Sequence, residues 1–359
     1  MKRIDLFITT NSKDFRMSKK YDTLVFIGRF QPIHNAHIEI IRRATELARQ
    51  IVIIVGSANQ PRTYKNPFTS HERELLIGNA VARVGNSDCS IRIEHNQDTI
   101  YNDQAWAVRV QSLVNKHTAG LPKTGIIGHS KDETSFYLKM FPQWEHEEVE
   151  LIEPLNATDI RDLYFRKDVN LRFLQNVVPS ATFKFLENFA NTEDYRQIIR
   201  EREFIAAYKK QFESLPYPPV FMTVDAVVMQ AGHVLMIRRR SEPGKGLWAL
   251  PGGFLNANTD RSLKDAMIRE LREETGIKVP APVIAGSIVR SKVFDAIDRS
   301  ARGRTITEAF FVCLGATGEL PKVKGQDDAD KARWVPIAEI KSEECFEDHY
   351  EIIQHFLGA

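Results

Sequence analysis

Short apolar runs alternate with longer amphipathic stretches through the first half of the chain. Residues 24–27 and 51–55 are wholly apolar, and each run ends at a glycine. Between these runs, apolar positions in residues 38–48 recur at helical spacing. Further strands are expected at residues 91–93 and 125–128, separated by a helix that ends near residue 115. This alternation predicts an α/β domain with a doubly wound, Rossmann-like parallel sheet covered by helices on both faces.

The pattern changes in the middle of the chain. Residues 193–214 are highly charged with apolar positions at helical spacing, and the proline-rich residues 215–219 end any helix there. Residues 220–229 and 234–238 have the pattern of strands around a turn at Ala231 and Gly232. We therefore expect an N-terminal extension (1–20), a first domain (21–190), a connecting helix and linker (191–218) and an α+β second domain (219–359).

Composition sets broad limits on the class of protein. The net charge is +2 (49 basic and 47 acidic residues), which forces neither a nucleic-acid nor a membrane partner. The cysteines match neither a disulfide framework nor a zinc site. No apolar run approaches the length of a membrane span, and residues 1–20 lack the apolar core of a signal peptide. These features favour a cytoplasmic protein and leave a homo-oligomer open.

The segment between the first predicted strand and helix has the composition of a phosphate site. It reads Gly28-Arg29-Phe30-Gln31-Pro32-Ile33-His34-Asn35-Ala36-His37. Gly28 lets the backbone approach a ligand, and the helix start offers N–H groups and a positive dipole end. His34 and His37 can donate to charge that develops on a phosphate. Two histidines at a helix start can also serve only as capping or core residues.

Further candidates lie in predicted loops and helix starts. Thr158 and Arg161 are three residues apart, so that a hydroxyl, a guanidinium and backbone N–H groups can meet one phosphate. Trp106 and Trp144 can stack on an aromatic ring, with core packing as an equal alternative. Arg73 lies near the start of a predicted helix, where an arginine is more often a solvated surface charge.

Together these residues resemble a known family. Residues 28–37 are similar to the G-x-F-x-P-x-H-x-G-H signature of nucleotidylyltransferases, with Ala36 in place of the usual glycine. Residues 21–190 as a whole resemble nicotinamide mononucleotide (NMN) adenylyltransferases of the archaeal-like type. The segments that carry this resemblance are Asn66-Pro67-Phe68, Glu72-Arg73, Lys131-Asp132, Phe141-Pro142-Gln143-Trp144 and Thr158-Asp159-Ile160-Arg161.

The resemblance implies a reaction and assigns roles. The NMN phosphate attacks the α-phosphorus of ATP, giving NAD and pyrophosphate without a covalent enzyme intermediate, so the protein aligns the reactants and stabilises charge. Mg²⁺ is carried mainly by the ATP phosphates. His34, His37 and Arg161 are expected at the triphosphate, with Thr158 positioning it. The backbone floor is expected from Gly28, Arg29 and Phe30, and the nicotinamide stack from Trp106 or Trp144. The resemblance also implies substrate contacts for residues of the matching segments, namely Asn66, Phe68, Arg73 and Lys131.

A second candidate site lies on a predicted helix of the second half. Glu270, Glu273 and Glu274 are spaced i, i+3 and i+4, so their carboxylates share one face. Arg269 is four residues before Glu273 and can pair with it. Clustered carboxylates bind hard cations such as Mg²⁺ or Mn²⁺. Glutamate-rich helices are usually only solvated, but the preceding Pro251-Gly252-Gly253 and the following Thr275-Gly276-Ile277 oppose that interpretation here.

These residues resemble the Nudix box, R-E-U-x-E-E-x-G-U, and the resemblance extends over about residues 219–359. It implies hydrolysis of a nucleoside diphosphate linked to another group, with Gly252 among the expected metal contacts. Glu308 is a further candidate ligand or base, although strand-edge glutamates are more often solvated. A fused adenylyltransferase and Nudix domain resembles bifunctional bacterial proteins, which implies ADP-ribose as substrate. Trp248 and Arg304 are candidate contacts for its adenine and pyrophosphate, with surface and core roles as equal alternatives.

The chain departs from the Nudix pattern in one loop. The pattern places a glutamate six residues after a box glycine and eight before the arginine, but these positions are Thr259 and Arg261. The loop is therefore two residues longer, and Asp260 is the acid available within it. We expect Asp260 to brace Arg269, helped by a helix N-terminus that favours negative charge.

Two alternatives remain open from sequence. The first domain could transfer a nucleotide to another phosphate acceptor, such as phosphopantetheine or a phosphosugar, which residues 67–68 and 141–144 oppose. The second domain could be a non-catalytic sensor that regulates synthesis or transcription. The intact box glutamates and the lack of an evident basic helix-turn-helix segment oppose this role.

Overall fold

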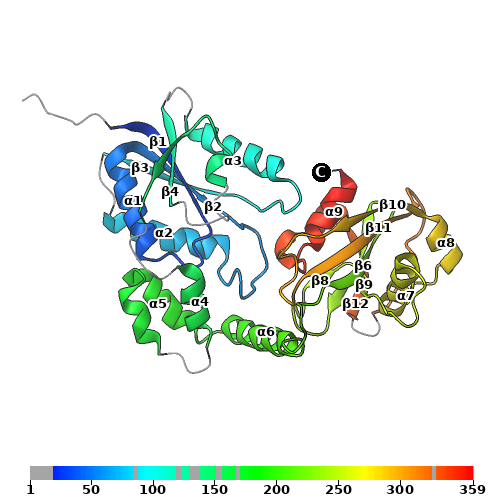
Figure 1. The fold of residues 1–359 in the computed structure, drawn as a ribbon. Helices are drawn as coiled ribbons and strands as arrows, with labels where there is room; N and C mark the ends of the chain where they lie inside the picture. Colours follow the sequence, from blue (N-terminus) through cyan, green and yellow to red (C-terminus); the bar gives the residue numbers. More distant parts are fainter. Residues whose placement is uncertain are drawn as a thin grey trace, which may run out of the picture.

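The computed structural model describes residues 19–84, 88–118, 123–129, 137–150, 156–166, 170–325 and 329–358. Most of the expected N-terminal extension and the candidate Lys131 lie outside these residues. Two sheets, each with its own helices, are linked by the long helix α6 (Glu193–Lys210) at the bottom of Figure 1. None of the helices in the described ranges combines the length and apolar character needed to cross a membrane.

The first sheet has five parallel strands in the order β3-β2-β1-β4-β5. They are β1 (Tyr21–Gly28), β2 (Ala48–Val55), β3 (Ser90–His95), β4 (Thr124–Gly128) and β5 (Glu145–Glu148). The connecting helices are α1 (Asn35–Leu47), α2 (Ser70–Val84) and α3 (Asp103–Thr118). The predicted parallel sheet is confirmed.

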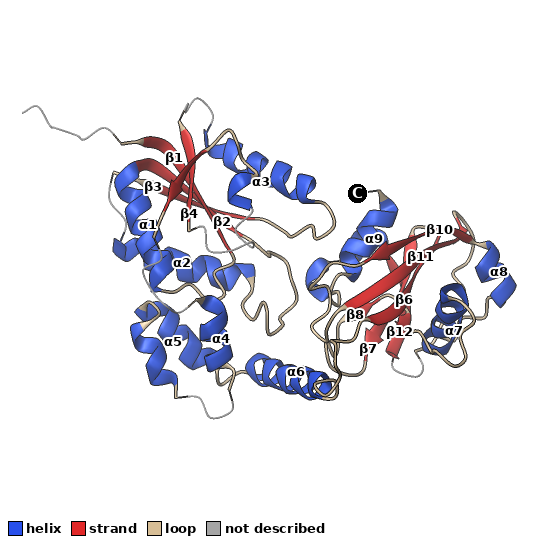
Figure 2. Ribbon diagram, in the orientation of Figure 1, coloured by secondary structure: helices blue, strands red, loops and turns tan. Residues whose placement is uncertain are grey.

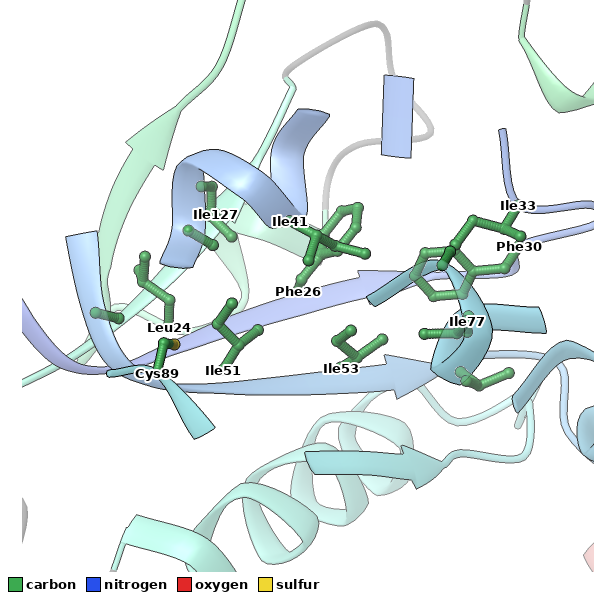
Figure 3. Packing of buried hydrophobic residues seen from close by; sticks show 14 of the residues in the cluster. Leu24, Phe26, Phe30, Ile33, Ile41, Ile51, Ile53, Ile77, Cys89 and Ile127 are labelled. Atoms are coloured by element: carbon green, nitrogen blue, oxygen red, sulfur yellow. The ribbon is translucent and has the colours of Figure 1, made fainter. Parts of the chain in front are cut away.

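Both faces of this sheet are buried, which explains the continuous apolar runs. Phe26 and Ile53 face α1 and α2, where they pack with Ile41 (Figure 3). Their chain neighbours Val25 and Val52 face α3 on the other side. Since successive side chains of a strand point to opposite faces, a strand covered on both sides is apolar at every position. The doubly wound architecture is therefore confirmed.

A small helical cluster follows the first sheet. It contains α4 (Ala157–Tyr164), the 3₁₀ turn η2 (Leu171–Asn176), α5 (Ser180–Phe189) and the start of α6. Tyr164 donates to the Leu186 carbonyl at 2.7 Å, and Tyr195 donates to the Tyr164 carbonyl at 2.8 Å. These buried bonds fix α4, so that its first turn is held beside the end of β1.

The second sheet is mixed (Figure 2) and has the order β10-β11-β6-β7-β12. The short strands β8 and β9 pair with β7 and β6. Its main strands are β6 (Phe221–Gln230), β7 (His233–Arg239), β10 (Ile288–Phe294), β11 (Thr305–Gly315) and β12 (Ala329–Pro336). The short strands are β8 (Trp248–Ala249) and β9 (Gly252–Phe254). Ala231 and Gly232 form the predicted turn with φ values of 45° and 75°.

Two helices cover the second sheet from opposite sides. Helix α7 (Leu263–Thr275) packs on Val224 and Ala226, whereas α9 (His349–Leu357) packs on Val227 and Val234. The other helical segments are α8 (Ala281–Gly286), η3 (Ile337–Glu339) and η4 (Ser342–Glu344). In Figure 1, α9 lies on the side of the second sheet that faces the first domain. The α+β prediction for this half is confirmed.

Candidate active sites

The turn after β1 is shaped by a glycine beneath an aromatic ring. A Cβ on Gly28 would lie 2.9 Å from the Phe30 ring and would force that ring to move. Phe30 has a φ of 52°, is 1% exposed and packs edge-on against Phe26. The turn therefore presents its backbone and the exposed Arg29 side chain to a ligand, while the Phe30 ring belongs to the core.

His34 and His37 lie together where α1 begins. Their ring centroids are 3.9 Å apart, and the His34 backbone N–H donates to His37 Nδ1 at 3.3 Å. A neutral His37 that accepts at Nδ1 carries its proton on Nε2. Burial lowers the pKa of His34 to about 4, and burial together with His34 lowers the pKa of His37 well below its usual value. Both imidazoles are therefore neutral at pH 7, and each can donate one N–H to an anion.

Arg161 adds a buried positive charge beside this turn. Its guanidinium donates to the Gln31 carbonyl at 2.8 Å and to Thr158 Oγ1 at 3.1 Å. Its Nε is buried without a hydrogen-bond partner, and no described carboxylate forms an ion pair with it. Burial, and then the charge of Arg29, lowers the pKa of Arg161 to about 10. A buried cation without a counter-ion marks a position where an anion would bind favourably.

The start of α4 differs from the expectation in one respect. Asn156 Oδ1 accepts the backbone N–H groups of Thr158 at 2.9 Å and Asp159 at 3.2 Å. An asparagine at this cap satisfies donors that would otherwise be free. The expected contribution of these backbone N–H groups to phosphate binding is therefore wrong, and the Thr158 and Arg161 side chains remain available.

Arg73 and Phe68 lie behind the candidate site. The Arg73 guanidinium is bound to main-chain carbonyls, at 2.6 Å for both Arg29 and Gly56 and at 2.9 Å for Ser57. With 1% of its surface exposed, Arg73 ties together the turns after β1 and β2. Phe68 is buried against aromatic neighbours. The expectation that Arg73 and Phe68 touch substrate is corrected, because both side chains are directed into the protein core. Sequence spacing alone does not show this direction.

A cavity of about 840 Å³ lies between the first domain, α6 and the second domain. Asn66, Trp106 and Tyr137 line its first-domain side, and the buried Asn66 Oδ1 has no partner among the described residues. Trp144 does not line this cavity and stacks on Phe141, with centroids 4.4 Å apart. Of the two tryptophans, Trp106 therefore has the position of a ring-stacking residue.

A second cavity, of about 440 Å³, lies in the second domain between β6, β9 and α7. Arg269 is its central cation. Nε and Nη2 of Arg269 donate to Asp260 at 2.9 and 2.8 Å, and Nη1 contacts Glu270 and Glu273 at 2.8 and 2.9 Å. The expected brace from Asp260 is confirmed. The longer loop therefore places an aspartate where its carboxylate reaches the arginine.

The glycines before α7 leave room for its glutamates. A Cβ on Gly253 would lie 2.6 Å from Glu270 Oε1, and the Gly252 N–H donates to Glu274 Oε2 at 2.9 Å. Burial, opposed by this bond and assisted by the charge of Glu270, raises the pKa of Glu274 to about 8. Carboxylates crowded in this way would be stabilised by a cation.

The donor set suits a divalent ion, although it does not form a closed cage. Oxygen ligands from Glu270, Glu273 and Glu274 line the cavity and match hard cations. Within the described ranges, however, no three acidic, histidine or cysteine side chains converge with metal-ligand geometry. Two of the three glutamates, Glu270 and Glu273, are instead paired with Arg269.

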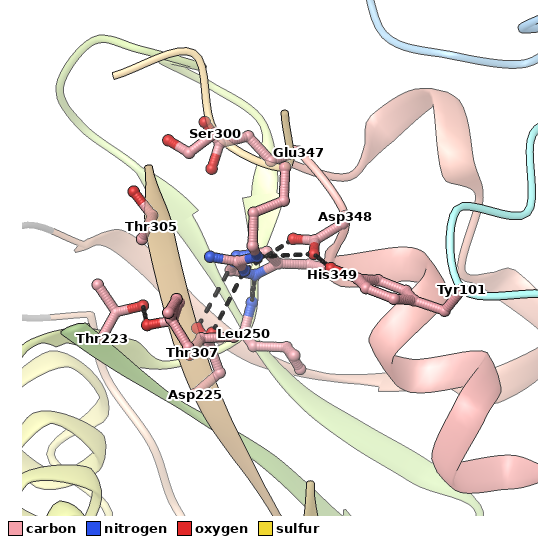
Figure 4. Close-up of polar contacts among 12 residues, drawn as sticks. Tyr101, Thr223, Asp225, Leu250, Ser300, Thr305, Thr307, Glu347, Asp348 and His349 are labelled. Carbon is pink, nitrogen blue, oxygen red and sulfur yellow. Dashed lines mark hydrogen bonds and ion pairs between the residues drawn. The ribbon is translucent and has the colours of Figure 1, made fainter. Parts of the chain in front are cut away.

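Sequence reasoning missed a buried polar network beside the second cavity (Figure 4). Arg299 donates to both carboxylate oxygens of Asp348, at 2.9 and 2.8 Å, and lies 3.9 Å from Asp225. Tyr101 of the first domain donates to the same Asp348. His349 Nδ1 accepts the Leu250 N–H at 2.8 Å. These residues are dispersed over the sequence without a motif, so only the tertiary structure brings them together.

Three other candidates lie apart from the glutamate helix. Glu308 accepts from Ser291 at 2.6 Å and does not line the second cavity, so its role remains a prediction. Trp248 lies under the Arg333 guanidinium and lines neither cavity. Arg304, the other candidate contact for ADP-ribose, lines the interdomain cavity and not the second cavity. Arg302, two residues earlier, does line the second cavity. Gly303 lies between the two arginines and has a φ of 144°.

Comparison with known proteins finds a family match in each half of the chain. A cytidylyltransferase-like family model matches residues 25–163, and a NUDIX domain model matches residues 220–356. The structure is similar along its length to the crystal structure of a bifunctional NMN adenylyltransferase/ADP ribose pyrophosphatase from Francisella tularensis, complexed with AMP and manganese. The TM-score is 0.86 and the identity 34%, over 94% of this chain and 99% of that one. The chain belongs to this bifunctional family.

Relatives of the separate halves support the family assignment. A nicotinamide/nicotinic acid mononucleotide adenylyltransferase of Acinetobacter baylyi is 40% identical over 181 residues, which are 50% of this chain and 92% of the relative. An ADP-ribose pyrophosphatase of Methanocaldococcus jannaschii is 29% identical over 162 residues, which are 45% of this chain and 83% of that protein. The chain thus combines a nucleotidyltransferase and a Nudix hydrolase domain.

Proposed function

We propose that the first domain transfers the adenylyl group of ATP to NMN and that the second hydrolyses ADP-ribose to AMP and ribose 5-phosphate. The observation that carries the first activity is the uncompensated Arg161 beside two neutral histidines at the end of β1. The second rests on three glutamates around one cavity. NAD is the product of the first activity, and ADP-ribose, the substrate of the second, is NAD without its nicotinamide. We place the protein in the cytoplasm.

In adenylyl transfer, an NMN phosphate oxygen attacks the α-phosphorus of ATP as the bond to the bridging oxygen breaks and pyrophosphate leaves. Arg161 balances the triphosphate charge, and Thr158 Oγ1 orients its guanidinium. His34 and His37 donate neutral N–H groups, which need no loss of a proton as negative charge moves onto the leaving group. Mg²⁺ bound to ATP neutralises phosphate charge. The aromatic face of Trp106 supports the pyridine ring.

In hydrolysis, water adds to one phosphorus of ADP-ribose and the pyrophosphate P–O bond breaks. A divalent cation would be held by Glu270, Glu273 and Glu274, and it supplies polarisation of the pyrophosphate and activation of water. Gly252 orients Glu274 through its backbone N–H. Arg269 orients the other two glutamates, and Asp260 holds Arg269 from the opposite side.

Two incubations test the proposal. Purified protein with NMN, ATP and Mg²⁺ should form NAD and pyrophosphate in equal amounts. Separately, ADP-ribose with Mg²⁺ or Mn²⁺ should give AMP and ribose 5-phosphate. Replacing NMN with phosphopantetheine or a phosphosugar should give no product, and product from either would favour the other acceptor class. ADP-ribose that binds but is not cleaved with either metal would favour a sensor role for the second domain.

A further inference from the structure

The interdomain cavity has a wall from each domain. Asn66, Trp106 and Tyr137 lie on the first-domain side. The second-domain side is formed largely by the segment between β10 and β11, which we call the β10–β11 loop (residues 295–304). Seven of its residues line the cavity: Ile297, Asp298, Arg299, Ser300, Ala301, Gly303 and Arg304. The cavity of about 840 Å³ falls within the range of about 300–1,000 Å³ that is usual for ligand pockets.

This loop is bound to both domains. Lys65 of the first domain pairs with Asp298. The Arg299 side chain is 3% exposed and forms a two-bond pair with the fully buried Asp348, to which Tyr101 of the first domain also donates. A buried, hydrogen-bonded charge pair with a third partner holds its groups in one arrangement. The loop therefore stands as a fixed wall opposite Trp106.

Two side chains of this wall remain open for a ligand. Ile297 is 81% exposed although it is a large apolar residue, and it lies on the cavity lining. Arg304 also lines the cavity, and its guanidinium has no ion pair or hydrogen-bond partner in the described part of the chain. On the facing side, Asn66 Oδ1 is buried without a partner. An apolar surface, a free cation and a free amide oxygen suit a small anionic ligand with an aromatic ring.

We propose that the β10–β11 loop of the Nudix domain forms one wall of the mononucleotide site of the adenylyltransferase, with Ile297 and Arg304 contacting the pyridine mononucleotide. This inference rests on the proposed adenylyl transfer to NMN. Ile297 covers the apolar part of the ligand opposite Trp106, and Arg304 supplies positive charge to a substrate that carries a phosphate. The second domain thus sets the affinity of the first domain for its acceptor.

Steady-state kinetics of the full chain tests whether Ile297 and Arg304 contact NMN. We expect the KM for NMN to rise about tenfold in Arg304→Ala and about threefold in Ile297→Ala, with kcat and the KM for ATP within twofold of the parent. Direct NMN binding measured by calorimetry should weaken by the same factors. Val293→Ala is the matched control, because Val293 is exposed on the neighbouring strand β10 and lines neither cavity.

The outcomes separate this inference from the proposed function. A parent that makes NAD from NMN and ATP, with both variants at the parent KM for NMN, would overturn the inference alone. A parent that neither binds nor converts NMN overturns both. ADP-ribose hydrolysis should be unchanged in Ile297→Ala. A loss of hydrolysis in Arg304→Ala without a change in the KM for NMN would return Arg304 to the Nudix site and contradict the shared wall.

Discussion

Replacing Asp260 with alanine removes the carboxylate that holds Arg269 from outside the glutamate cluster. The Asp260 side chain is 4% exposed and accepts two bonds from Arg269. These bonds, together with the backbone N–H of Asn256, lower the pKa of Asp260 from 3.8 to about 2. Since one pKa unit is about 1.4 kcal/mol, the depression corresponds to roughly 2 kcal/mol, which solvent at the partly exposed Arg269 reduces to about 1–2 kcal/mol.

The pH dependence of this stabilisation has a definite sign. A carboxyl group whose folded-state pKa is depressed stabilises the protein fully above its unfolded pKa, near 4, and less as the pH falls towards 2. Asp260→Ala should therefore be less stable than the parent at pH 7, by about 1–2 kcal/mol, and the difference should shrink below pH 4. Urea denaturation at pH 7 and at lower pH measures it.

The same substitution should raise the metal requirement of hydrolysis. Without Asp260, Arg269 keeps Glu270 and Glu273 as its ion-pair partners and competes more strongly with a cation for them. We expect the Mg²⁺ concentration for half-maximal ADP-ribose hydrolysis to rise about tenfold, the lower end for groups that orient metal ligands. NAD synthesis should not change.

Asp265 offers a matched control for the loss of an acidic side chain near α7. Asp265→Ala removes the same charge from an exposed position in the first turn of α7, where no contact with Arg269 is present. It should leave the Mg²⁺ requirement within twofold of the parent. If Asp260→Ala hydrolyses ADP-ribose with the parent's Mg²⁺ dependence, the brace does not act on the metal site and the reasoning is wrong.

Three further predictions follow from the two sites and their junction. His37→Ala should lower NAD synthesis by at least about 100-fold and leave ADP-ribose hydrolysis unchanged, since the histidine lies in the other domain; parallel loss of both rates would contradict this. Glu274→Gln should abolish hydrolysis and yet raise the melting temperature at pH 8 in EDTA. The reason is that a carboxyl whose folded-state pKa is raised to about 8 loses its stabilisation of the fold as the pH rises towards 8, whereas the neutral amide does not. An unchanged or lower melting temperature would show that the Glu274 carboxylate does not destabilise the fold at this pH. Tyr101→Phe should lower the unfolding free energy by about 1 kcal/mol through loss of the bond to Asp348, and equal stability in urea would show that this bond contributes nothing.

Much of the fold was accessible from the sequence because local patterns carry it. Apolar runs such as residues 51–55 require burial on both faces, and only a sheet covered on both sides provides it. The glutamates at 270, 273 and 274 share a helix face whatever the rest of the chain does. The position of Asp260 within its loop was enough to predict a contact with Arg269, since both lie close together in the sequence.

The tertiary structure decided where side chains point and which residues, distant in sequence, they contact. Arg73 belongs to a matching segment, yet its donors bind the main chain, because the turns after β1 and β2 close around it. Arg304 faces the first domain rather than the glutamates, and Tyr101 reaches Asp348 across the domain junction. The sequence determined the helices and strands, and the chemistry of residues close in sequence, through the local spacing of apolar and charged positions. The shared cavity depends on how two separately patterned domains pack, and no local periodicity encodes that arrangement.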